Sequence, residues 1–155
     1  MRPALHRGQL DAITVWEPQM QRAANRIGAD AIVFCDPAVY GERFNLCTTQ
    51  AHLDHPALRP KIVAFVRALI AATEELRHAP SEAQRLVAQA AELDIETVKN
   101  AWPYLTYPAR LSPDLADIVL PVDVWVAKET GRAPRTLGEL AKLIDGGVLR
   151  EVLDC

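Results

Sequence analysis

The sequence lacks the features that mark several classes of protein. No apolar stretch approaches the roughly 18 residues that cross a bilayer. The three cysteines (Cys35, Cys47 and Cys155) are an odd number without CxxC spacing, so neither a disulfide framework nor a zinc site is expected. The first eight residues are basic but contain no apolar core and no cleavage site. They are therefore not a secretory signal, and the chain as written is expected in the cytoplasm.

The chain is also poor in the signals of nucleic-acid binding and of catalysis. Its net charge is −3, and the 17 basic residues form no run, which argues against a nucleic-acid partner. It has no glycine-rich phosphate loop, since Gly146-Gly147 lacks the fingerprint, and no nucleophile elbow. We therefore expect no enzyme and no cofactor. What is present is 155 residues, 50% of them hydrophobic, which suffices for one folded domain.

The chain divides into a β-like beginning and a helical remainder. Apolar and β-branched runs predict strands over 10–15, 30–35 and 44–49, the second of them covered on both faces. Between the first two, Pro18 starts a helix that Gly28 ends. After residue 50 the apolar spacing becomes helical, with starts predicted at Pro56, Pro80, Asp94, Ser112-Pro113 and Thr136. Pro121 lies inside the fourth of these helices and should kink or split it.

This set of elements predicts a helix-rich α/β fold that is incomplete. Three strands covered on both faces cannot bury one another, because such strands need further parallel neighbours. The chain is therefore expected to be part of something larger or one partner in an assembly, as a homodimer or with a complementary chain.

Four segments resemble one family in their order and spacing. They are Gly8–Ala12 (GQLDA), Trp16–Pro18 (WEP), Asp54–Phe65 (DHPALRPKIVAF) and Pro80–Ala83 (PSEA). The sequence is similar to the C-terminal half of the solute-binding proteins of ABC importers for nitrate, alkanesulfonates and taurine, and of the related binders of thiamine pyrimidine precursors. The resemblance implies a partial two-lobed periplasmic-binding-protein-like fold. In it, residues 1–42 are the tail of lobe two, 43–50 a hinge crossover strand, and 51–155 the helical part of lobe one.

The same resemblance implies a function and its partners. The chain would be the solute-binding component, or a fragment of it, for a small organic or anionic solute, and the full-length form would meet ABC permease subunits. With a signal on that form, the location would be periplasmic or extracellular. The alternative is a remnant that binds no ligand and self-associates as a structural protein. A pyrimidine-synthase enzyme is disfavoured, because no cysteine cluster occurs.

The candidate ligand-binding residues are Trp16, Glu17, Tyr40 and Asn45. Trp16 and Glu17 stand where a predicted strand ends and a helix begins, the position at which open α/β sheets bind ligands. Trp16 offers an apolar wall and Glu17 an acceptor for an amine, although a core Trp and a Glu that favours the helix N-terminus fit as well. Tyr40 follows the second strand, and Asn45 lies on the hinge strand. The run His52–His55 suggests capping rather than a metal site.

Overall fold

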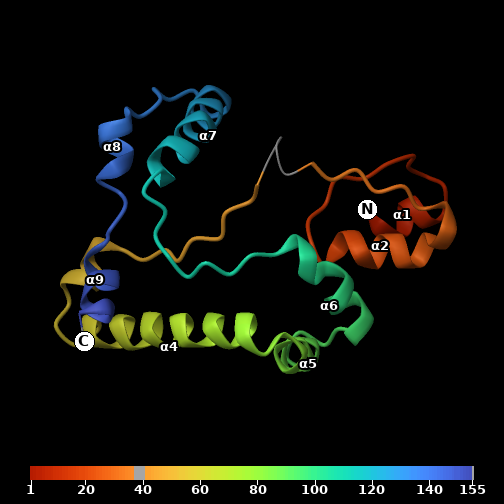
Figure 1. Cartoon of the computed structure of the whole chain (residues 1–155). Helices are drawn as coiled ribbons and strands as arrows, with labels where there is room; N and C mark the ends of the chain where they lie inside the picture. The colour runs from red at the N-terminus through yellow and green to blue at the C-terminus, as the bar shows by residue number, and fades with distance from the viewer. Residues whose placement is uncertain (37–40, 155) are drawn as a thin grey trace. The chain divides into compact units, whose positions relative to one another are not determined.

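The computed structural model describes residues 1–36 and 41–154, and over these residues the chain is helical (Figure 1). It divides into two compact units. Unit 1 comprises Met1–Cys47 and Glu74–Tyr107, and unit 2 comprises Thr48–Thr73 and Pro108–Cys155. Among the described helices, none is both long and apolar enough to span a membrane. The predicted lobe boundaries near residues 42 and 50 remain a prediction.

Unit 1 is built from short helices whose ends follow local sequence signals. Its elements are α1 (Arg2–His6), α2 (Gln19–Ile27), the 3₁₀ turn η1 (Gly28–Asp30), α5 (Pro80–Ala90), α6 (Ile95–Ala101) and the 3₁₀ turn η2 (Trp102–Tyr104). Helix α2 ends at Gly28, whose φ of 81° lies in the region that favours glycine. Helix α6 begins after Asp94, whose carboxylate accepts a hydrogen bond of 2.7 Å from the Thr97 N–H. Both predicted helix signals are confirmed.

The interior of unit 1 is made of small side chains. Helix α6 lies against both α2 and α5. The buried residues at these contacts are Ala23, Ala83, Ala88, Thr97, Val98 and Ala101. Alanine lets helices approach closely, but each methyl group removes little apolar area from water. The interior of this unit therefore contributes little hydrophobic stabilisation.

Unit 2 consists of most of the long helix α4, three shorter helices and α7. Its elements are α3 (Gln50–Asp54), α4 (Arg59–His78, whose last turns belong to unit 1), α7 (Leu115–Thr130), α8 (Leu137–Ala141) and α9 (Gly147–Leu153). The Arg59 N–H donates to the His55 carbonyl at 3.0 Å, so helical hydrogen bonding reaches back to the predicted start near Pro56. Helix α7 continues through Pro121, so it is not split there. The predicted capping box at Thr136 is present.

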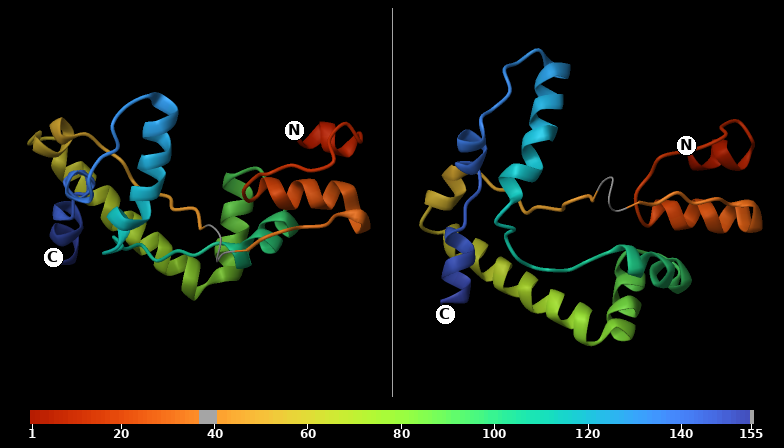
Figure 2. Two further views of the ribbon diagram at one scale, coloured as in Figure 1. Left: turned by 90° about the horizontal axis from the view of Figure 1, so that it is seen from above. Right: turned by 45° about the horizontal axis from the view of Figure 1, so that its top comes forward.

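Helices α4 and α9 are joined by Arg59. Its Nε donates to Glu151 Oε1 at 2.8 Å, and its Nη1 donates to the Leu53 carbonyl at 3.3 Å. Figures 1 and 2 show α9 beside the first turns of α4. One guanidinium thus holds the start of α4, the end of α3 and the last helix together.

A buried carboxylate closes the turn between α7 and α8. Asp123 on α7 accepts from Arg132 Nη1 at 3.2 Å, from the Arg135 N–H at 2.7 Å and from Arg135 Nη1 at 2.8 Å. The hydrogen bonds from Arg132, followed by those from Arg135, hold the pKa of Asp123 well below its ordinary value. The segment after Gly131 is thereby fixed against α7.

The three predicted strands are absent from the described residues. Within 10–15, 30–35 and 44–49 the structure shows no strand, and Asp30 belongs to η1 instead. The prediction that the chain is rich in helices is confirmed, whereas the prediction of these three strands is wrong for the described residues. The reason is that a strand is stabilised by hydrogen bonds to a neighbouring strand, which β-branched composition alone does not provide. These segments have no such neighbour within residues 1–36 and 41–154.

The chain exposes more surface than its mass requires. Two separate compact units of half this mass would together expose about 9,300 Å². The chain exposes 11620 Å². Part of the difference comes from residues 31–36 and 41–49, which lack regular structure. In these segments the apolar side chains of Ile32, Phe34, Phe44 and Leu46 are exposed. Soluble monomeric proteins rarely expose large apolar patches of this kind.

Candidate functional site

The start of α2 presents two of the predicted ligand-binding residues. The Trp16 carbonyl accepts hydrogen bonds from the N–H groups of Gln19 at 2.8 Å and Met20 at 3.2 Å, which anchors its backbone to the first turn of the helix. The Trp16 side chain is 62% exposed, so it is not a core residue in this structure. An indole held at a fixed backbone position and open to solvent can form a wall for a ligand.

Glu17 lies beside it and is half-buried. Its Oε2 accepts from the Gln21 N–H and its Oε1 from Gln21 Nε2, both at 3.4 Å. Burial raises the pKa of the Glu17 carboxyl, and the hydrogen bonds from Gln21 oppose that shift. Both contacts are long, so the carboxylate keeps capacity to accept hydrogen bonds from a ligand amine. The alternative prediction, that Glu17 favours the helix N-terminus, agrees with the same contacts.

The other two predicted site residues are Tyr40 and Asn45. Tyr40 lies outside the described residues. Asn45 is exposed in a segment without regular structure, where its carbonyl lies 3.8 Å from Cys47 Sγ. Among the hydrogen bonds of the described residues, none joins Asn45 to Trp16 or Glu17. Of the four predicted site residues, the structure thus shows Trp16 and Glu17 next to each other at the start of α2, and the four-residue site stays a prediction.

The histidine run at residues 52–55 makes local hydrogen bonds. Thr49 caps α3 by accepting from the His52 N–H at 3.3 Å. Asp54 Oδ1 accepts from Gln50 Nε2 at 2.8 Å, and His55 Nδ1 accepts from the Ala57 N–H at 3.1 Å. The part of the chain that the structure describes contains no group of three or more side chains arranged to hold a metal ion.

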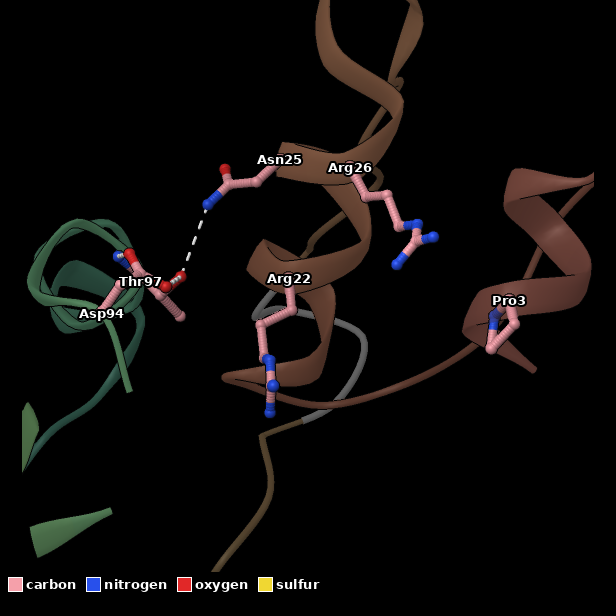
Figure 3. A pocket seen from close by; sticks show the side chains of 6 residues that line it. All are labelled: Pro3, Arg22, Asn25, Arg26, Asp94 and Thr97. Carbon is pink, nitrogen blue, oxygen red and sulfur yellow. Dashed lines mark hydrogen bonds between the residues drawn. The ribbon is translucent and has the colours of Figure 1, made fainter. Parts of the chain in front are cut away.

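A second feature of unit 1 is an open pocket along α2. It has a volume of about 460 Å³ and is called the α2 pocket below. Figure 3 shows side chains from α1, α2 and the start of α6 around it. They are Pro3, Arg22, Asn25, Arg26, Asp94 and Thr97.

The α6 side of the α2 pocket is a connected set of hydrogen bonds. Thr97 Oγ1 donates to Asp94 Oδ2 at 2.6 Å and accepts from Asn25 Nδ2 at 3.5 Å (Figure 3). Hydrogen bonds from the Thr97 side chain and N–H lower the pKa of Asp94, and the nearby charge of Arg22 adds to the effect. Asp94 is therefore ionised and already partnered at neutral pH.

Only part of this pocket could be predicted from the sequence. Asp94 was expected as a helix cap, and this role is confirmed. Arg22 and Arg26 stand four residues apart on a predicted helix, which places them one turn apart on one face. What the sequence could not show is that α6, about 70 residues later, provides the facing side.

Comparison of this chain with protein-family models, with curated proteins and with solved structures gives no match.

Proposed function

We propose that this chain is part of a solute-binding protein of an ABC importer and takes up a small organic or anionic solute such as nitrate, a sulfonate, taurine or a pyrimidine precursor. The observation that carries the proposal is the WEP segment. Trp16 is exposed beside the half-buried Glu17, at the point where an irregular segment enters α2. An aromatic wall next to a carboxylate suits a flat or amine-bearing solute.

Two segments without regular structure support a chain that is completed by further polypeptide. Residues 31–36 and 41–49 lack regular structure, and they carry exposed apolar side chains. In the two-lobed arrangement that the family resemblance implies, these segments would be strands with neighbours in the other part of each lobe. The exposed area of the chain agrees with such missing neighbours.

The proposed site is tested by removing the indole. Trp16→Ala, in the form reconstituted with its second lobe, should weaken solute binding by about 30-fold or more, because an anchoring aromatic side chain commonly contributes roughly 2 kcal/mol. Isothermal titration calorimetry with nitrate, alkanesulfonates, taurine and a hydroxymethylpyrimidine measures the loss. Trp125→Ala is the matched control, since Trp125 on α7 is also 62% exposed. Equal affinity of the two variants would contradict the proposal.

A second candidate function is favoured by the exposed apolar side chains alone. In it, the chain binds no solute and self-associates through residues 31–36 and 41–49. One measurement separates the two functions. If the second is correct, the chain forms a homodimer, and the dissociation constant of that dimer is unchanged by any of the solutes and by Trp16→Ala.

A further inference from the structure

We propose that helix α7 pairs in antiparallel orientation with α7 of a second copy of this chain. The contact surface is the apolar stripe of Ile118, Val122 and Trp125, called the α7 stripe below. This inference goes beyond the proposed function, because the stripe contains none of the candidate solute-binding residues. It also differs from association through residues 31–36 and 41–49, which lie outside α7.

The composition of α7 is that of a helix with neighbours on more than one side. From residue 118 to residue 127 every side chain is apolar except that of Asp123. A helix that is apolar around its whole circumference is normally buried by its surroundings. In this structure, however, Trp125 is 62% exposed and Val122 is 48% exposed. The helix therefore has an apolar face that its own unit leaves uncovered.

The buried face of α7 is a different one. Asp123 and Ala127 are buried, and helix α8 packs against α7. The hydrogen bonds from Arg132 and Arg135 to Asp123 lie on this buried face. At 3.6 residues per turn, the members of the α7 stripe lie within about 60° of one another, and the centre of the stripe is about 150° from the buried face. The contacts that hold α7 in unit 2 therefore leave the stripe open.

The charged residues beside the stripe indicate which partner fits it. Asp117 and Lys128 are both exposed, and they lie on the same flank of the stripe because they are three helical turns apart. In an antiparallel pair related by a two-fold axis, the same flank of each helix faces its partner. An axis that passes between positions 122 and 123 is equally far from both charges. Asp117 then faces the partner's Lys128, and Lys128 faces the partner's Asp117.

The opposite flank of the stripe has the same symmetry. Val119 and Val126 lie on it, both half-buried, and both are equally far from the same axis. In the antiparallel pair, valine therefore meets valine on one flank while acid meets base on the other. A parallel pair would set Asp117 level with the partner's Asp117 and would lose this match. The pattern is thus self-complementary, and a second copy of α7 is the partner that it fits.

The size of the stripe sets how strong this contact can be. A helix of 16 residues is about 24 Å long, and a specific interface usually buries more than about 1,000 Å². Exposed ion pairs are screened by salt and fix orientation more than affinity. Pairing through α7 alone is therefore weak, and a cross-link, which captures short-lived contacts, measures it better than molecular mass does.

The test compares two cysteine variants of the full chain, Val122→Cys and Val124→Cys. Val124 is the matched control, because it is also 48% exposed on α7 but lies about 160° around the helix from Val122. Both variants are made in a background in which serine replaces Cys35, Cys47, Cys155, Phe34 and Phe44, so that neither the native thiols nor the irregular segments contribute. Diamide oxidises two thiols to one disulfide and takes up their two hydrogens. Val122→Cys should give cross-linked dimer about tenfold faster or more, because pairing raises the effective concentration of the two thiols.

Charge exchange tests the orientation. In the Val122→Cys chain, Asp117→Lys should slow cross-linking at low ionic strength, because lysine then faces lysine at both ends of the pair. Adding Lys128→Asp should restore the rate. The exchanged chain keeps the new lysine in the first turn of α7, so restored helix stability does not account for such a rescue. Equal rates for Val122→Cys and Val124→Cys would overturn the proposal, as would a rate that Asp117→Lys leaves unchanged or that Lys128→Asp does not restore.

Discussion

The exposed apolar side chains of residues 31–36 and 41–49 lead to the most direct prediction, which is that the isolated chain associates. Phe34 is 91% exposed, Ile32 and Phe44 are each 79% exposed, and Leu46 is 58% exposed. Full burial of one such side chain contributes about 1.5–3 kcal/mol. Scaled by the exposed fractions, covering all four on both protomers of a dimer gives roughly 9–18 kcal/mol.

The cost of association reduces this gain to a measurable range. Loss of translational and rotational freedom takes roughly 4–15 kcal/mol. The middle of these ranges leaves about 4 kcal/mol, a dissociation constant of about 1 mM. Replacing Phe34 and Phe44 by serine removes roughly half of the gain, which exceeds that remainder. The double variant should therefore stay monomeric at every concentration at which the parent chain associates.

Sedimentation velocity from about 0.1 mM to about 3 mM, a range that brackets the expected dissociation constant, measures the association. Leu143→Ser is the control, since Leu143 is 69% exposed but lies in unit 2, outside these segments. Amide exchange of residues 31–36 and 44–49 should slow with concentration in the parent chain only. The reasoning is refuted by a parent chain whose mass is independent of concentration and which melts cooperatively without binding an apolar dye.

Three smaller predictions concern single side chains. Glu17→Gln should raise the melting temperature slightly above pH 6: burial raises the pKa of Glu17, so its ionised form opposes folding at high pH and the cost disappears as the pH falls below its unfolded value. Asp123→Asn should lower the melting temperature at pH 7, because Arg132 and Arg135 lose the carboxylate that accepts their hydrogen bonds. Since the pKa of Asp123 is lowered in the folded chain, the difference between variant and parent should persist down to about pH 4 and shrink only in stronger acid. A pH series of thermal melts measures this. Thr136→Ala should destabilise α8 by about 1 kcal/mol, seen as faster amide exchange confined to that helix.

Helix ends were predictable because their causes are local. Gly28, Asp94 and Thr136 act through their own φ angles or through N–H groups two to three residues away. A window of a few residues contains all of that information. The start of α7 shows the limit: Ser112-Pro113 was expected to begin the helix, whereas the first helical residue is Leu115, with Asp114 as the N-cap.

Strands and sites were less predictable because their causes are distant. The apolar run Ala31–Cys35 has strand propensity, but only a neighbouring strand can turn propensity into a ladder. The α2 pocket likewise depends on Asp94 and Thr97, which lie about 70 residues beyond Arg22. The sequence could predict that Trp16 and Glu17 lie side by side at the start of a helix, because they are adjacent and precede Pro18. Asn45 had no such local constraint, and the structure leaves it apart from them.

The hydrogen bonds of Asp123 have a consequence for the order in which the chain folds. They span only 9 and 12 residues, to Arg132 and Arg135, so the loop that must close is short. Contacts of such low sequence separation form on the microsecond scale, well before pairings across the whole chain. The α7–α8 hairpin should therefore be among the first elements to acquire native protection in pulsed hydrogen exchange, and a nascent chain would acquire it only once Arg135 has left the ribosome.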